Sequence, residues 1–369
     1  MEYEELLDIS ALIAPISEES PVGVDPREDI SPTSRYFTLK DSRSQARANE
    51  RASLVDDDSM QALVNDWRPI YEQVPEALAS EGKDLEYVAW LIEALCRIQG
   101  FAGLAVGFRL ARELIDKYWD ALYPLPDEDG LETRIAPLIG LNGYEGEGSL
   151  ITPIVSIPIT EFNGEESFAT WQYSRAAEIA LLDEDKQRQK ADSGIASLEQ
   201  IENAVKTTPS GFYVSLMAEL DSAIEEFRLL SDVMDAAMGG VPQPTSTITK
   251  SLAKCHEAIR YLAGDIIDQA SASVESTDES DEQALPSGDS QAVEQKIPKK
   301  LETREQAVRM LEEVSEFFRK TEPHSPMPYA IDQVVRWSGL ELPELLQELI
   351  EDGNSRNNYF RLTGIPVGD

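Results

Sequence analysis

The residue types that most often carry chemistry are scarce in this chain, and their spacing fits no catalytic site. Only two histidines and two cysteines occur among its 369 residues. Cys255 and His256 are adjacent within a helical pattern, where neighbouring side chains point about 100° apart and cannot form a nucleophile–base pair. His324 is flanked by prolines, which favours a turn residue over a general base. None of these residues has the spacing of zinc ligands.

Two further motifs approach known binding loops and fail on their spacing. Residues 127–130 (DEDG) begin like a calcium loop, but the glycine comes too early and Leu138 would occupy the last ligand position. Gly143, Gly146 and Gly148 suggest a phosphate loop, but glutamates interleave them and no Lys-Ser or Lys-Thr pair follows. The sequence therefore predicts no enzyme, no cofactor and no metal site. An unrecognised pair of catalytic carboxylates stays an open alternative.

One group of basic residues could bind a partner. Arg43, Arg47 and Arg51 are spaced four apart, so they share one face of a predicted helix. Two interpretations stay open. The stripe is either a solvated face paired with Glu50 or Asp56–Asp58, or a docking face for an acidic partner such as another subunit.

The net charge of the chain argues against two classes of partner, nucleic acids and membranes. The net charge is −37, from 69 acidic and 32 basic residues. A field of that sign repels phosphate backbones and anionic membranes, so we expect no nucleic-acid binding and no direct membrane insertion. The acidic start MEYEELLDIS lacks the basic region of a signal peptide, and both cysteines fall in apolar helical stripes. These features predict a cytoplasmic protein with reduced thiols.

Apolar residues recur every three or four positions through most of the chain, which predicts an all-α fold. Segment 84–129 holds two amphipathic helices that meet at Gly100 and end at a Pro-x-Pro turn. Gly103 and Gly107 lie one turn apart and predict close packing inside the domain. Further helices are predicted over about 36–51, 61–80, 168–182, 197–206, 212–238 and 248–266.

Segment 135–160 has a different character. It is rich in glycine and then in β-branched residues, which are typical of strands. Pro153 and Pro158 would interrupt a sheet ladder. We therefore expect an edge strand or an extended arm here.

Changes in composition suggest four parts. Helical patterns fill residues 1–165 and a middle region, 166–267, that could pack on the first. Residues 268–298 are rich in acids and serine and contain no aromatic residue, so we expect a flexible acidic linker. Residues 299–369 hold patterns for three short helices.

The final part is too small to bury much core by itself, and oligomerisation is a common remedy at that size. We therefore expect self-association through this small helical C-terminal domain. Its candidate packing or oligomer contacts are Phe317, Phe318, Tyr329 and Trp337.

Several of these stretches together resemble a known family. The stretch SPVGVDPREDIS, then YFTLKDSRSQARANER, the pair Asp66-Trp67, and DLEYVAWLIEALCRIQGFAGLAVG resemble the ImpA N-terminal domain. That domain is the signature of the TssA proteins of bacterial type VI secretion systems, and the resemblance covers about residues 10–160. The stretch EPHSPMPYAIDQVVRWSGLELPELLQELI is similar to the end of the shorter TssA proteins.

The resemblance implies a cytoplasmic, non-enzymatic assembly protein. TssA proteins act with the baseplate, and in some cases at the distal end of the growing tail. They help to coordinate assembly of the Hcp tube and the TssB/TssC contractile sheath, and their C-terminal domains form high-order rings. Two other functions stay open: an acidic chaperone or nucleic-acid mimic that binds basic partners, and an enzyme with an unrecognised carboxylate site.

Overall fold

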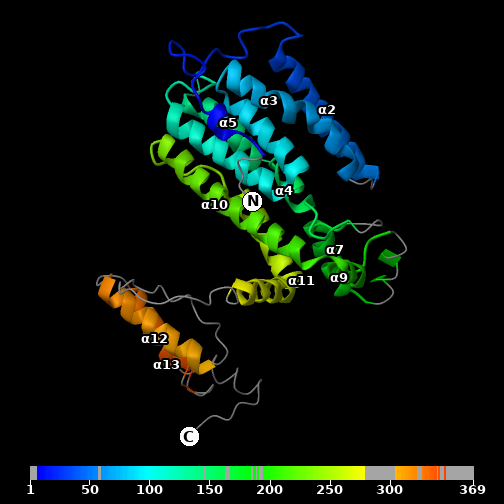
Figure 1. The fold of residues 1–369 in the computed structure, drawn as a ribbon, viewed down its shortest axis with the longest axis vertical. Coiled ribbons are helices and arrows are strands. Elements are labelled where there is room, and N and C mark those ends of the chain that lie inside the picture. Colours follow the sequence, from blue (N-terminus) through cyan, green and yellow to red (C-terminus); the bar gives the residue numbers. More distant parts are fainter. Residues whose placement is uncertain are drawn as a thin grey trace, which may run out of the picture. The chain divides into compact units, whose positions relative to one another are not determined.

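The chain forms two compact units, Met1–Ala284 and Leu285–Asp369, drawn in Figure 1. The computed structural model describes residues 6–56, 60–128, 130–144, 146–162, 167–183, 186–187, 189–190, 194–278, 304–321, 326–338, 340 and 345. Over these residues the elements are helices, without a β-strand. The all-α prediction is confirmed.

The first unit is a bundle of helices (Figure 1) with a large apolar core and a smaller apolar cluster of Phe168, Ala176, Ile201 and Ala204. Its longer helices are α2 (Arg35–Asp56), α3 (Arg68–Ser80), α4 (Leu85–Tyr118), α10 (Ser210–Ala237) and α11 (Ser246–Asp278). Its shorter elements are α1 (Ile9–Leu12), the 3-10 helix η2 (Met60–Trp67), α5 (Leu131–Asn142), α6 (Ile151–Ser156), α7 (Thr170–Ala180) and α9 (Leu198–Thr207). Helix α4 lies at the centre, in contact with α3, α5, α6, α10 and η2.

Helix α4 is two helices folded back on each other. At Gly100 the backbone leaves the helical region, with φ 59° and ψ −136°. A Cβ on Gly103 would lie 2.3 Å from the carbonyl oxygen of Leu95, and one on Gly107 would lie 2.8 Å from Ile92 Cγ1. The two halves therefore approach as closely as their backbones permit. This confirms the two predicted helices and the predicted packing role of the glycines.

By length and composition, α4 would be apolar enough to cross a membrane. Most of its residues are instead buried inside the first unit, and its direction reverses at Gly100. The core helix of a soluble protein has the same composition, so α4 gives only weak evidence for a membrane span.

Side chains fix both ends of α4. The Asp84 carboxylate accepts hydrogen bonds from the backbone N–H groups of Glu86 (2.8 Å) and Tyr87 (3.0 Å), as an N-cap should. At the other end, Arg134 donates to the carbonyl oxygen of Trp119 over 2.6 Å. Helix ends carry unpaired backbone groups, so these two contacts satisfy groups that burial would otherwise leave without partners.

Helix α10 packs along the second half of α4. The rings of Phe108 and Phe227 have centroids 4.8 Å apart, and Arg112 Nε lies 3.1 Å from a carboxylate oxygen of Glu226. The middle region thus shares the core of the N-terminal helices. Whether it folds as a separate domain, with the boundaries expected near 165 and 267, stays a prediction.

Asn142, the last residue of α5, caps a helix that begins more than a hundred residues later. Its Oδ1 accepts hydrogen bonds from the backbone N–H groups of Thr247 and Ile248, both 2.9 Å long, at the start of α11. A capping side chain usually belongs to the helix it caps. Here it joins two distant segments of the chain.

The expectation for segment 135–160 was wrong, because α5 and α6 cover most of it. Pro153 is the third residue of α6, in the first turn, where a backbone N–H has no acceptor within the helix. Ile154 is fully buried, so contact with the core favours this short helix. Extended pairing is confined to the end of the segment, where Ile159 N–H donates to the carbonyl of Phe168 over 2.7 Å.

The predicted start of the acidic linker, at residue 268, differs from the structure. Helix α11 continues to Asp278, so the first residues of the predicted linker are helical. The remaining predicted linker residues lie outside the described part of the chain.

In the second unit, α12 (Arg304–Thr321) and α13 (Met327–Ser338) pack against each other. Ser315 is 1% exposed, and its Oγ lies 2.5 Å from Asp332 Oδ1. Arg319 forms an ion pair with the same Asp332 carboxylate. The third helix expected after Pro343 lies outside the described residues, apart from Leu345.

Candidate functional site

The loop that carries SPVGVDPREDIS is bonded to the start of α4. Arg27 forms an ion pair with Asp84 and a second one, 3.1 Å long, with Glu86. Tyr36 Oη donates to the same Glu86 carboxylate over 2.8 Å. Burial raises the pKa of Asp84, and the Arg27 charge opposes that rise. These polar groups hold the loop in place, so the motif is explained as an anchor rather than as a ligand site.

Two ion pairs join α2 to α4, and each helix supplies the arginine of one pair and the glutamate of the other. Arg43 of α2 donates from Nε and Nη2 to the two carboxylate oxygens of the fully buried Glu93, and the Nη2 contact is 3.2 Å long. Arg97 of α4 binds Glu50 of α2 in the same way, with one contact of 2.9 Å. Trp67 Nε1 also donates to Glu50 over 2.8 Å. Both carboxylates are therefore fully engaged inside the first unit.

The rest of the arginine stripe is not paired in this way. Arg47 is half-buried and Arg51 is exposed, and neither forms a hydrogen bond or an ion pair within the described residues. Burial lowers the pKa of Arg47, and the charges of Arg43, Arg51 and Arg97 lower it further while Glu93 opposes them.

Of the acidic partners considered for the stripe, Glu50 forms its ion pair with Arg97. The side chains of Asp56–Asp58 lie outside the described residues. The two charged groups that sequence reasoning missed, Glu93 and Arg97, carry a recognisable signal. They stand four apart in a stretch, residues 87–98, whose other residues are apolar or aromatic, and a charge buried there requires a partner.

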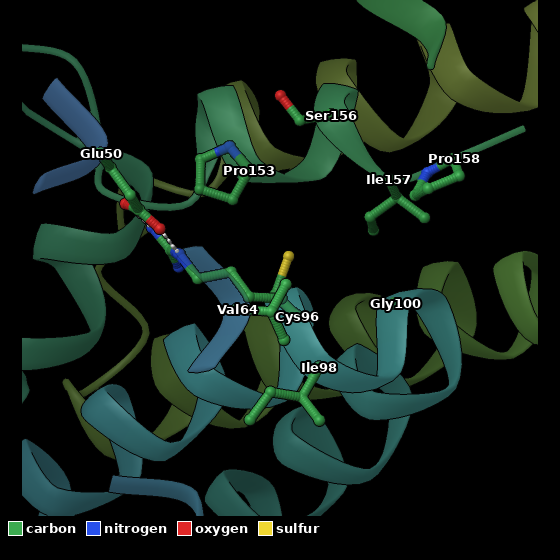
Figure 2. A pocket seen from close by; sticks show the side chains of 10 residues that line it. Glu50, Val64, Cys96, Ile98, Gly100, Pro153, Ser156, Ile157 and Pro158 are labelled. Carbon is green, nitrogen blue, oxygen red and sulfur yellow. Dashed lines mark hydrogen bonds and ion pairs between the residues drawn. The ribbon is translucent and has the colours of Figure 1, made fainter. Parts of the chain in front are cut away.

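Beside the Glu50–Arg97 pair is a small pocket, shown in Figure 2. Its volume is about 130 Å³, and it lies where α6 faces the break in α4. It is lined by Glu50, Val64, Cys96, Arg97, Ile98, Gly100, Pro153, Ser156, Ile157 and Pro158. Pockets for small-molecule ligands usually measure about 300–1,000 Å³. This one has room for a single aliphatic side chain.

The pocket's reactive groups are not activated. Burial raises the pKa of Cys96 to about 12, so its sulfur carries a proton at neutral pH and is a poor nucleophile. The Glu50 carboxylate is occupied by Arg97 and Trp67. The arrangement can therefore hold an apolar group next to fixed charges, but it offers neither a free base nor a thiolate.

Lys83 is the other unusual charged group. It is fully buried, and its Nζ donates to the carbonyl oxygens of Leu12 (2.7 Å) and Leu78 (2.6 Å), near the ends of α1 and α3. Burial lowers the pKa of Lys83 to about 8, and Lys117 adds to the effect. A buried lysine can serve catalysis, but here both bonds go to main-chain carbonyls, which indicates a structural role.

The aromatic candidates of the second unit lie on α12 and α13. Phe318 and Trp337 are partly buried, and Tyr329 is 72% exposed. The side chain of Phe317 lies outside the described residues. None of these positions is shown to touch a partner, so all stay predictions, as do Arg43, Arg47 and Arg51.

The histidines do not assemble a site either. His256 Nε2 lies 3.5 Å from a carboxylate oxygen of Asp221 on the half-exposed faces of α11 and α10. His324 lies outside the described residues. Within the described part of the chain, no group of three or more histidines, cysteines and acids could hold a metal ion.

The amino-acid sequence is similar to those of known proteins. Residues 13–143 match the family described as ImpA, N-terminal, type VI secretion system. The chain is also 24% identical to the type VI secretion system component TssA1 of Pseudomonas aeruginosa, over 96% of its own length and 98% of the relative. Residues 13–143 thus match the ImpA N-terminal domain, and the chain is similar to a TssA protein along nearly its whole length. The two alternative functions, the acidic chaperone or mimic and the enzyme, find no support in these relatives.

A solved structure extends the likeness beyond the matched domain. The chain resembles the N-terminal domain, including the conserved ImpA_N region, of the TssA component from Burkholderia cenocepacia, with a TM-score of 0.58 and 24% identity. The match covers 70% of this chain and 94% of that structure. At this identity the likeness concerns the fold alone. It covers a larger share of the chain than residues 13–143, so helices beyond α5 take part in it.

Proposed function

We propose that this protein is a TssA-type assembly component, cytoplasmic and non-enzymatic, that coordinates the baseplate, tube and contractile sheath of a type VI secretion system. The observation that carries the proposal is the similarity to TssA1 along nearly the whole length of both chains. Its partners are expected to be baseplate proteins, the Hcp tube and the TssB/TssC sheath. The expected role needs several binding surfaces on one chain and no reaction centre.

The chemistry of the first unit supports a binding role. The buried Glu93 and Glu50 are engaged by Arg43 and Arg97, the Cys96 thiol is protonated, and the pocket beside the Glu50–Arg97 pair has room for no more than a side chain. A search for catalysis would need convergent groups with perturbed pKa values in an accessible cleft. Lys83 and Cys96, two groups whose pKa values burial shifts, lie in the core and are not accessible to a substrate.

We further propose that the second unit forms a ring of several copies. Its helical hairpin leaves large apolar side chains on the surface, with Val314 37%, Val334 47% and Tyr329 72% exposed. Two helices bury little apolar area by themselves, and association with other copies would cover these side chains.

Light scattering on two versions of the chain tests the ring. The whole chain is expected to form a discrete high-mass oligomer, and a version ending at Asp278 is expected to have the mass of a monomer or a small oligomer. A monomeric whole chain at micromolar concentration would refute the ring. Co-purification of the whole chain with baseplate, sheath and tube proteins from the same secretion system would then show which components it binds.

A further inference from the structure

Among the described residues, four arginines and two glutamates gather where α2 crosses α4. Six charged side chains meet there: Arg43, Arg47, Arg51, Arg97, Glu50 and Glu93. Four of them form the two ion pairs described above. Arg47 and Arg51 remain, in a chain whose net charge is −37.

The carboxylates of the two pairs form no hydrogen bond or ion pair with Arg47 or Arg51, although Glu93 is near enough to oppose the lowering of the Arg47 pKa. Each carboxylate already binds a guanidinium through both oxygens, and Glu50 accepts a further bond from Trp67. Arg47 is also half-buried, so its charge is partly removed from water without a bonded partner in the described residues. Leaving a charge in that condition costs free energy that an added anion would recover.

The pocket is close to these arginines in the sequence of α2. Glu50, which lines it (Figure 2), comes three residues after Arg47 and one before Arg51, and Arg97 lines it from α4. Several of its other walls are apolar, formed by side chains such as Val64, Ile98 and Ile157. A surface with one apolar recess next to two free guanidinium groups suits a ligand that combines an aliphatic side chain with carboxylates.

We propose that this surface, made of Arg47, Arg51 and the pocket beside the Glu50–Arg97 pair, docks a short acidic segment of a partner protein that carries one aliphatic anchor. Carboxylates of the segment pair with Arg47 and Arg51, whose Cβ atoms, four residues apart on a helix, are separated by about 5–6 Å. The aliphatic side chain enters the pocket. The choice of a protein partner rests on charge complementarity together with the size of the recess. Nucleic acid and lipid would instead bring many phosphates against a strongly acidic molecule.

The inference rests on the proposed role in assembly, because it names the chemistry of one partner surface. Its test is a binding measurement, so its failure would leave the light-scattering test of the ring unaffected. The probe is a fluorescein-labelled peptide, SDEELAEEGS, whose anisotropy is followed while the whole chain is added at low salt. Two matched peptides replace all acids by their amides (SNQQLAQQGS) or the leucine by alanine (SDEEAAEEGS).

The expected result is saturable binding of SDEELAEEGS that weakens as salt rises. Arg47→Glu with Arg51→Glu is expected to weaken it at least tenfold, and Ser156→Leu, which fills the pocket, by several-fold. Arg51→Glu alone changes an exposed side chain, keeps the fold, and is expected to weaken binding by a smaller factor. The amide peptide is expected not to bind, and the alanine peptide to bind several-fold less tightly.

The control variant is Lys250→Glu with Lys254→Glu, which reverses two exposed cations four residues apart on α11 and changes the net charge equally. It is expected to bind within about twofold of the unaltered chain. Equal loss in the control and in the arginine variant would overturn the proposal, since net charge alone would then explain binding. Equal affinity for the alanine peptide would overturn the anchor, and no binding by the unaltered chain would overturn the surface as a whole.

Discussion

At the scale of single residues, the buried charges among the described residues have two kinds of partner. Glu93 and Glu50 each accept hydrogen bonds from an arginine of the opposite helix, whereas Lys83 and Arg134 donate to backbone carbonyl oxygens. Buried charges are retained only with such partners, because desolvation is costly. Replacing one charged residue of such a pair should therefore lower the free energy of unfolding.

Glu93→Ala is expected to destabilise the first unit by about 3 kcal/mol, since it leaves Arg43 against the core without its carboxylate. Urea unfolding followed by circular dichroism measures the change. Arg228→Ala is the control, because its ion pairs with Glu225 and Asp232 lie on an exposed surface and contribute little. Equal midpoints for the two variants would show that the crossed pairs have no special role.

The stability of the unaltered chain should depend on pH through Lys83. The folded pKa is lowered from 10.5 to about 8, so between these values the unfolded chain binds more protons than the folded chain. Stability relative to Lys83→Met should therefore rise with pH over that window, by about 1–2 kcal/mol between pH 8 and pH 10. Urea unfolding of both proteins across this range measures it. A constant difference between them would contradict the lowered pKa.

At the scale of elements, the central feature is the hairpin inside α4. Gly100 reverses the chain, and Gly103 and Gly107 let the second half lie directly against the first. The sequence pattern was sufficient to predict both helices and the glycine packing, because spacing and helix-end glycines are local signals. Segment 135–160 was predicted wrongly, because its short helices depend on burial of residues such as Ile154.

Gly103→Ala is expected to cost at least about 2 kcal/mol, because its Cβ would lie 2.3 Å from the Leu95 carbonyl oxygen and the helices must separate. The matched control is Gly264→Ala in α11, where no atom lies within 4 Å of the added Cβ. There the gain in helix propensity should stabilise the protein slightly. Thermal unfolding of both variants gives the comparison. A Gly103→Ala protein as stable as the control would refute the close approach.

At the scale of the whole molecule, the first unit and the second unit differ in what they bury. The first has one extended core that runs from α1 to α11. The second, as far as it is described, is a helical hairpin with exposed apolar side chains. This difference is why we assign partner recognition to the first unit and self-association to the second.

Tyr329→Asp is expected to break the high-mass oligomer, because it places a charge on the apolar surface of the hairpin. Its control is Tyr144→Asp in the first unit, where the tyrosine is 79% exposed, close to the 72% of Tyr329. Size-exclusion chromatography with light scattering should show loss of the oligomer in the first variant only. Retention of the oligomer by both variants would remove Tyr329 from the interface.

The sequence by itself determined what depends on local order. The spacing of apolar residues predicted the helices. The motif tests found no catalytic spacing. Stretches such as SPVGVDPREDIS indicated the resemblance to TssA proteins. Only the tertiary structure decided what depends on residues far apart in the chain. It paired Arg43 with Glu93 and Glu50 with Arg97, placed Asn142 at the start of α11, and left Arg47 and Arg51 unpaired among the described residues. The reason is physical: helix propensity acts between near neighbours, whereas a buried charge takes its partner from whichever helix the fold brings against it.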